Sequence, residues 1–132
     1  MRPLALRQTT VTPEVSFQPD QGLLVMMGEC YPENPSLFFA PILGAVEAHF
    51  RASRLHAFEA RFRLTYVNSA SAKALRRLFG VMNAMAEHGV AVAVTWQHDA
   101  LDDAAVELGD DLASGLMRID YRAEALREAA VG

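Results

Sequence analysis

Two serines occupy a position in this sequence where a phosphate could be held. Ser69 and Ser71 lie where an alternating apolar pattern gives way to a helical one, and Lys73 follows one turn later. Free backbone N–H groups and the positive end of the helix dipole stabilise a phosphate at such a position. Phosphorylation would add a charge of about −1.5 to −2 and three acceptor oxygens. The alternative is that Asn68 or Ser69 serves only as the helix N-cap.

Thiol and metal chemistry are the other two possibilities. Cys30 could act as a nucleophile with His98 as its base, although a lone cysteine also packs well as a small buried hydrophobic residue. A metal ion could be gathered by a third set of side chains: Glu29, Glu33, His98 and Asp99. No pair among them stands at a diagnostic ligand spacing. We therefore predict no catalytic residue, no metal and no cofactor, and a protein that is not an enzyme.

The composition narrows the class of protein. A chain of 132 residues with 52% hydrophobic and 21% charged residues is expected to fold as one domain over residues 1–132. The net charge of −4, without a basic stripe, argues against nucleic acid as a partner. No apolar run reaches the roughly 20 residues that span a bilayer. One cysteine and no secretory pattern predict a cytoplasmic protein.

The chain is expected to begin with an arm and a hairpin. Residues 1–11 have no clear period and are predicted to form a loose arm. Val15 and Phe17 then alternate with polar neighbours, turn residues occupy 19–22, and an apolar run covers 23–27. This pattern predicts two antiparallel strands.

A helix and a strand are predicted next. Asn34 is a good N-cap and Pro35 suits the first helical position. Pro41 lacks a backbone donor, so we expect it to kink the helix or delay its regular start. Phe58 to Tyr66 alternates apolar and polar residues, which indicates a strand with one buried face.

The second half of the chain continues the helix and strand alternation. A helical stripe follows Ser69 and closes at Gly89. The β-branched run from Val90 to Trp96 is typical of a central strand buried on both faces. Asp99 is expected to cap a third helix. A short strand near Leu116 to Ile119 and a final helix from Ala123 to Ala130 are predicted to complete the chain.

The predicted fold is a single α/β domain with a mixed sheet of four to five strands, in the order β-β-α-β-α-β-α-(β)-α, with a helix or tail over 122–132. Helical crossovers normally join parallel strands. The loops after Gly28, Tyr66 and Trp96 should then leave the same edge of the sheet, where such folds usually bind their ligands.

Several segments of the sequence also resemble the SiaC family of bacterial biofilm-regulating phosphoproteins. They are Thr12–Phe17, Gly28–Asn34, Phe38–Ile42, Leu64–Lys73 and Val94–Trp96, with Asp103, Glu107 and Gly109. Together they extend over about residues 12 to 119. The Tyr-Pro-Glu-Asn run with its following Phe-Phe is the most specific of them.

The resemblance implies a STAS-like fold and a partner switch. In this family a dedicated Ser/Thr kinase of histidine-kinase fold phosphorylates a Thr or Ser at the start of the second helix, and a PP2C-type phosphatase removes the phosphate. The unphosphorylated protein binds and activates a diguanylate cyclase, which links it to cyclic di-GMP signalling and biofilm formation. The alternatives are an anti-anti-sigma-like protein that binds an anti-sigma kinase, and a thiol enzyme that uses Cys30.

The resemblance places the phosphoacceptor on Ser69, with Ser71 as the alternative. Where the family has an aromatic pair after the tryptophan, this chain has Gln97 and His98. We expect the unmodified protein to present one edge to its effector. The residues predicted to bind the partner are Tyr31, Pro32, Glu33, Asn34, Asn68, Lys73, Trp96 and His98.

Overall fold

The structure is a computed structural model that describes residues 3–52 and 56–126. Its strands lie across one sheet in chain order: β1 (Leu4–Leu6), β2 (Glu14–Gln18), β3 (Leu23–Glu29), β4 (Ala57–Thr65), β5 (Ala91–Asp99) and β6 (Asp120–Leu126). The helices are α1 (Pro35–Ala52), α2 (Ser69–Glu87), α3 (Asp103–Ala113) and a short 3-10 turn, η1 (Pro19–Gln21). Strands β1 to β3 pair antiparallel, and β3 to β6 pair parallel.

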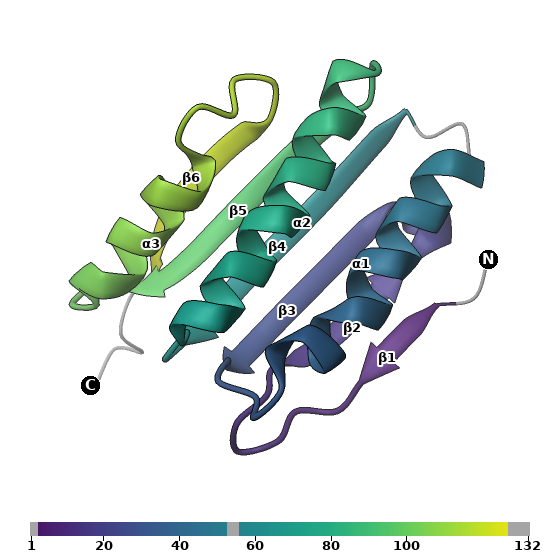
Figure 1. The fold of residues 1–132 in the computed structure, drawn as a ribbon. Helices are drawn as coiled ribbons and strands as arrows, with labels where there is room; N and C mark the ends of the chain where they lie inside the picture. Colours follow the sequence, from purple (N-terminus) through teal and green to yellow (C-terminus); the bar gives the residue numbers. More distant parts are fainter. Residues whose placement is uncertain (1–2, 53–55, 127–132) are drawn as a thin grey trace, which may run out of the picture.

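The three α-helices are the crossovers between the parallel strands, and they cover one face of the sheet (Figure 1). Buried residues therefore alternate with mostly exposed residues along β4 and with partly exposed residues along β5, because the opposite face carries no helix within the described part of the chain. The expectation that Val90 to Trp96 is buried on both faces is wrong for this reason. The alternation predicted for Phe58 to Tyr66 is confirmed as far as Thr65, where β4 ends. Tyr66 itself lies outside the strand and is 78% exposed, so its expected place on the buried face is wrong.

Aromatic rings fill the core beneath α2. The centroid of Phe62 on β4 lies 5.5 Å from that of Phe79 on α2 and 5.7 Å from that of Trp96 on β5. Gly109 brings α3 onto this cluster, since a Cβ there would lie 2.7 Å from Trp96 Cδ1. The indole Nε1 of Trp96 donates a hydrogen bond to the carbonyl of Ala105 (2.9 Å), which satisfies its polar group inside the core.

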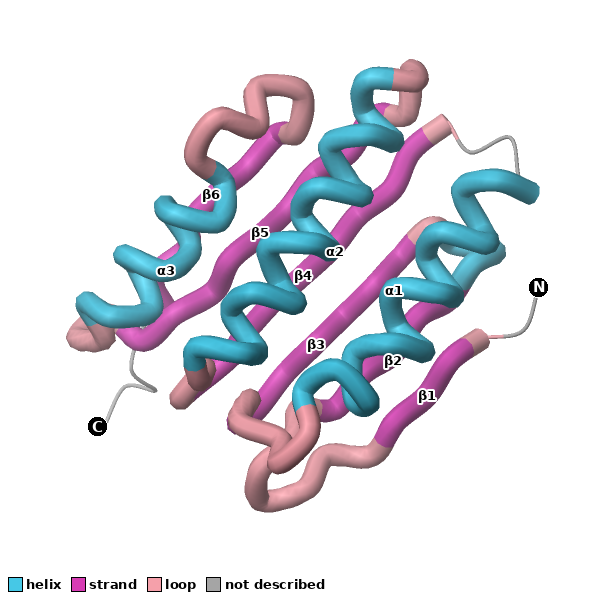
Figure 2. Tube along the Cα trace, viewed as in Figure 1, coloured by secondary structure: helices cyan, strands magenta, loops and turns pink. Residues whose placement is uncertain are grey.

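The two outer strands of the sheet, β1 and β6, differ from the sequence prediction. Within the predicted loose arm of residues 1–11, Leu4 to Leu6 form β1 and pair with β2. The last strand is Asp120–Leu126, not Leu116–Ile119, and it occupies the first part of the predicted final helix (Figure 2). Residues 127–132 of that predicted helix or tail lie outside the described residues. The sheet therefore has six strands, with β1 and β6 at its edges.

The structure confirms the predicted start of α1 and corrects the predicted cap of α3. Helix α1 begins at Pro35 as expected and continues through Pro41, whose side chain is exposed, so its regular start is not delayed. The cap of α3 is Asp102, whose Oδ1 accepts from Ala105 N (3.0 Å), and not Asp99. Asp99 ends β5 and caps the turn before the helix by accepting from Leu101 N (2.9 Å).

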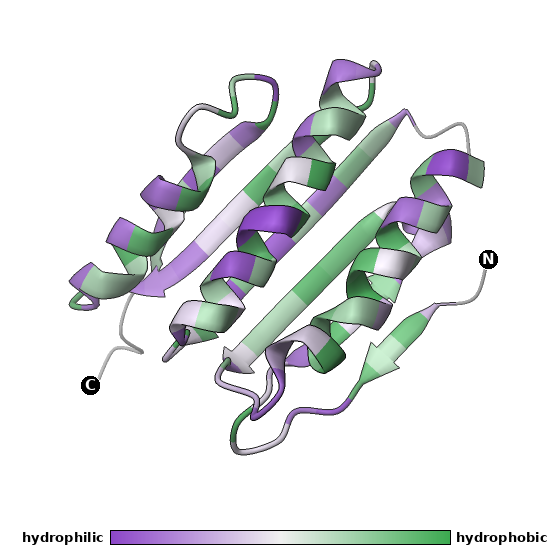
Figure 3. Ribbon diagram, viewed as in Figure 1, coloured by the Kyte–Doolittle hydropathy of each residue, from purple (hydrophilic) through white to green (hydrophobic). Residues whose placement is uncertain are grey.

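Figure 3 shows that β3 is mostly hydrophobic, whereas β4 alternates with hydrophilic residues. Among the described residues, no helix combines the length and hydropathy needed to span a membrane.

Candidate functional site

One edge of the sheet collects the loops that were predicted to lie together. Strands β3, β4 and β5 all end there, and α1, α2 and α3 all begin there (Figure 2). The prediction that the loops after these three strands meet at one edge is confirmed. Strand β5 continues to Asp99, so its loop begins three residues later than expected.

The three helix N-termini at this edge differ in charge. Asn34 caps α1 by accepting from Leu37 N (3.1 Å), and Asn68 caps α2 by accepting from Ser71 N (2.9 Å). Neither helix has an acidic residue in its first turn. Helix α3, in contrast, begins with Asp102 and Asp103. Glu33 directly precedes the Asn34 cap of α1, whereas no acidic residue stands in the first turn of α2. The start of α2 therefore favours anions, and the start of α3 favours cations.

The two candidate phosphoacceptors lie in opposite environments. Ser69 is the first residue of α2 and its side chain is exposed, with Lys73 exposed one turn later. Ser71 is fully buried at 0% exposure beside the Cys30 thiol, and its Oγ makes no hydrogen bond of regular geometry. The Ser69 side chain is accessible from solvent, whereas the Ser71 hydroxyl is not.

Backbone hydrogen bonds tie the loop after β3 to the start of α2. Cys30 N donates to Thr65 O (2.9 Å), and Asn68 N donates to Cys30 O (3.3 Å). On its other side, Tyr31 N donates to Val11 O (2.8 Å). The segment Tyr31–Asn34 and the start of α2 at Ser69 therefore belong to the same surface.

The environment of Cys30 opposes thiol catalysis. Burial raises the pKa of the Cys30 thiol to about 11, and the neighbouring Ser71 hydroxyl offsets only part of the rise. His98 lies two strands away on β5, about 9–10 Å across the sheet at the usual strand spacing. Its Nδ1 donates to the Asp99 carbonyl (2.9 Å). A buried, protonated thiol without a nearby base is a poor nucleophile.

The structure separates the predicted partner-binding residues into two groups. Those with exposed side chains are Tyr31, Glu33, Asn34, Asn68 and Lys73. Those with buried side chains are Pro32, Trp96 and His98. Within residues 3–52 and 56–126, no three His, Cys, Asp or Glu side chains group closely enough to hold a metal ion.

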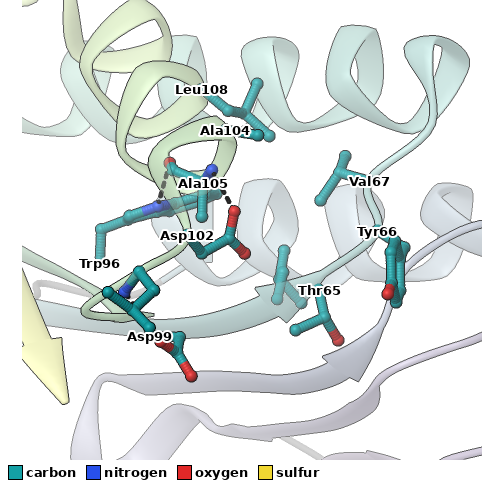
Figure 4. A pocket seen from close by; sticks show the side chains of 11 residues that line it. Thr65, Tyr66, Val67, Trp96, Asp99, Asp102, Ala104, Ala105 and Leu108 are labelled. Atoms are coloured by element: carbon teal, nitrogen blue, oxygen red, sulfur yellow. Dashed lines mark hydrogen bonds between the residues drawn. The ribbon is translucent and has the colours of Figure 1, made fainter. Parts of the chain in front are cut away.

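Two exposed apolar side chains at this edge were missed by the sequence analysis. Tyr66 is 78% exposed and Leu101 is 83% exposed. Both line a pocket of about 740 Å³ between the end of β4 and the start of α3, with Trp96 and Asp102 inside it (Figure 4). A second pocket of about 510 Å³ lies on the other side of Tyr66, toward Tyr31. The sequence pattern placed Tyr66 inside the predicted strand, among its apolar residues, and so gave no signal for its exposure.

Known proteins match nearly the whole chain. The sequence profile described as "SiaC family regulatory phosphoprotein" matches residues 6–124. A Pseudomonas aeruginosa (strain UCBPP-PA14) protein, "Uncharacterized protein PA14_02130", is 29% identical over 111 residues, which cover 84% of this chain and 87% of that protein.

Solved structures show the same fold. Apo-SiaC from P. aeruginosa has a TM-score of 0.88 at 26% identity, covering 95% of this chain and 100% of that one. A second structure, the diguanylate cyclase SiaD in complex with its activator SiaC, also from P. aeruginosa, gives a TM-score of 0.87 at 24% identity, covering 93% and 99%. The sequence profile matches well over half of the chain. This chain therefore belongs to the SiaC family of regulatory phosphoproteins.

Proposed function

We propose that this chain is a partner-switch regulator that is not itself an enzyme. In its unphosphorylated form it binds and activates a diguanylate cyclase in the cytoplasm, and phosphate on Ser69 blocks that docking. A Ser/Thr kinase of histidine-kinase fold adds the phosphate and a PP2C-type phosphatase removes it. Through the cyclase, the switch controls cyclic di-GMP and biofilm formation.

The position of Ser69 carries this proposal. Its exposed side chain stands at the N-terminus of α2, one residue after the Asn68 cap, whose backbone N–H donates to the carbonyl of Cys30, the residue before Tyr31. A modification there lies within the surface that also presents Tyr31 and Tyr66. Ser71, the alternative acceptor, is fully buried, so we assign the switch to Ser69 alone.

Charge and desolvation explain why phosphate would release a partner. The start of α2 is electropositive in the unmodified protein, with no acidic residue in its first turn and Lys73 nearby. A phosphate of about −1.5 to −2 reverses the sign of this surface. Burying it without partners costs several kcal/mol. A loss of about 2.7 kcal/mol already weakens binding 100-fold.

The comparison with P. aeruginosa supports the choice of effector. There SiaC is the activator of the diguanylate cyclase SiaD, and the present chain shares its family and fold. The family description as regulatory phosphoproteins supports control by phosphate.

The test measures binding to, and stimulation of, the diguanylate cyclase of the source bacterium. We expect Ser69→Ala to bind like the unmodified protein, and kinase-treated wild type to bind at least about 100-fold more weakly. Ser69→Asp should lie between them because it carries only one charge. Ser114→Asp, at an exposed serine after α3, is the matched control and should bind normally.

Mass spectrometry of the kinase-treated protein should map one phosphate to Ser69. Modification at Ser71 instead, equal binding of the modified and unmodified proteins, or binding of an anti-sigma kinase in place of the cyclase would each contradict the proposal.

A further inference from the structure

The larger pocket at the carboxyl edge has an apolar interior. Leu64 and Val67 contribute aliphatic carbon from the β4 side, and Leu108 does so from α3. Trp96 forms part of the wall, and its only polar atom already donates to the Ala105 carbonyl. An occupant therefore finds hydrophobic surface and no free indole donor.

Two large apolar side chains at this pocket are exposed to solvent. Tyr66, directly after β4, and Leu101, shortly before α3, both line it and are among the most exposed large apolar residues of the described chain. Apolar groups of this size are normally buried where the fold allows it. Their arrangement around one opening suits a surface that becomes covered by another molecule.

The backbone at Tyr66 is an independent sign of function. Its φ is +50°, and it is the only non-glycine residue with a positive φ among residues 3–52 and 56–126. A tyrosine in this conformation costs about 1–2 kcal/mol. Such strain collects at ligand-binding positions, where the surrounding structure holds it in place.

The charges at the pocket have one sign. Asp99 and Asp102 line it, and no Lys, Arg or His is among its lining residues. Both carboxylates are fixed, because Asp99 accepts from Leu101 N and Asp102 accepts from Ala105 N. Figure 4 shows Asp102 and Tyr66 on opposite sides of the opening. The site is complementary to a cation beside an apolar group, and it repels phosphate-bearing ligands such as nucleotides.

We infer that this pocket is the anchor site for the cyclase, and that it receives an apolar side chain flanked by a lysine or arginine. The inference rests on the proposed function and specifies which chemistry the effector presents. Val67 lines the pocket and Ser69 follows two residues later. The anchor and the switch would therefore be adjacent, so that one phosphate acts at the border of the main contact.

Four variants test the anchor by titration of the cyclase into each purified protein. Ala104→Phe fills the pocket from an exposed position on α3, and Leu101→Ser removes one side of its mouth. We expect each to weaken binding at least about tenfold. Asp102→Asn keeps a good N-cap, so it should weaken binding about threefold and flatten its salt dependence.

Met117→Ser is the control, because Met117 is 91% exposed in the loop that precedes β6. It should bind like the wild type. Thermal unfolding of each variant confirms that the fold is retained.

The outcomes separate the two claims. Normal cyclase binding by both Ala104→Phe and Leu101→Ser, beside a wild type that binds, overturns the anchor site and leaves the phosphorylation switch standing. A wild type that neither binds nor stimulates any diguanylate cyclase of its host overturns both. Weakened binding with unchanged salt dependence in Asp102→Asn overturns the cationic flank and retains the apolar anchor.

Discussion

The two ends of the sheet solve the same geometric problem with different residues. At the amino end, the tight turns before β3, β5 and β6 use Gly22, Gly89 and Gly115, all with positive φ. At the carboxyl end, Gly28 near the end of β3 also has a positive φ, but the turn after β4 uses Tyr66. Glycine adopts this conformation with little steric cost, whereas tyrosine does not. Strain is therefore kept at the end where the candidate site lies.

The pockets at the two ends differ in the charges of the residues that line them. The amino-end pocket, of about 520 Å³, places Arg118 with Glu59 and Asp120, so its charges are mixed. The carboxyl-end pocket carries only the charges of Asp99 and Asp102. A strained tyrosine and unbalanced charge at one end support the proposal that the partner docks at this end.

The largest expected effect concerns Cys30, which is buried beneath the candidate site. Cys30 should be almost inert at pH 8, because with a pKa of about 11 only about one thiol in 1000 is ionised, against about a quarter for a free cysteine. We expect alkylation by iodoacetamide to be slower than that of an exposed thiol by a factor of roughly 100 or more. Intact mass over time measures the rate.

The exposed thiol of a Met117→Cys variant is the internal reference, and denaturant should make both thiols react alike. Rapid alkylation of native Cys30 would show that the carboxyl end opens readily, which would weaken the distinction between exposed Ser69 and sealed Ser71.

A pair of substitutions tests whether strain is placed for function. Gly89→Ala should destabilise the fold by about 1–2 kcal/mol, since φ is +96° and no atom lies within 4 Å of the added Cβ. Tyr66→Asn should stabilise it by about 0.5–1 kcal/mol, because asparagine tolerates a left-handed backbone. Urea unfolding measures both.

The effects of the two substitutions on cyclase binding should not follow their effects on stability. Gly89→Ala is expected to bind the cyclase normally, and Tyr66→Asn to bind it more weakly although it is more stable. A Tyr66→Asn protein that gains stability and keeps full binding would mean that the strained tyrosine has no role in docking.

Local signals predicted the elements that position the site. Asn34 with Pro35 and Asn68 with Ser69 marked the starts of α1 and α2, because capping depends on neighbouring residues. The alternation in β4 was readable because one of its faces is buried and the other is exposed.

Strand β6 could not be read in the same way. It is an edge strand whose residues are mostly exposed, and its Ala and Glu content favours a helix locally. Its backbone pairing with β5 decides its conformation. Tertiary context overrides propensity at such a position.

The site was predictable only in part. The helical stripe through Leu75 and Met82, extended back by one turn from Leu75, reaches Ser71 and would have indicated its burial. In contrast, the left-handed backbone of Tyr66 and the exposure of Leu101 depend on how two loops pack. No periodicity encodes them.

The smallest expected effect is a pH dependence of stability that originates from His49, at the amino end of the sheet. Burial lowers the pKa of His49 on α1, aided by the charge of the chain's N-terminus, while Asp20 and the Pro19 backbone oppose part of the change. The folded state then binds fewer protons than the unfolded state below a pH of about 6.5. The contribution of His49 to stability is therefore present above that pH and is lost as the pH falls toward the folded-state pKa.

Urea unfolding at pH 7.5 and pH 5.0 measures this contribution. A His49→Gln protein should lose less stability between the two values than the wild type, because the group that takes up the proton is gone. His56→Gln, at an exposed histidine before β4, should behave like the wild type. An equal acid-induced loss in His49→Gln and wild type would place the titrating group elsewhere. Since His49 packs against Phe17, the effect should appear in stability and leave cyclase binding unchanged, as the division of roles between the two ends requires.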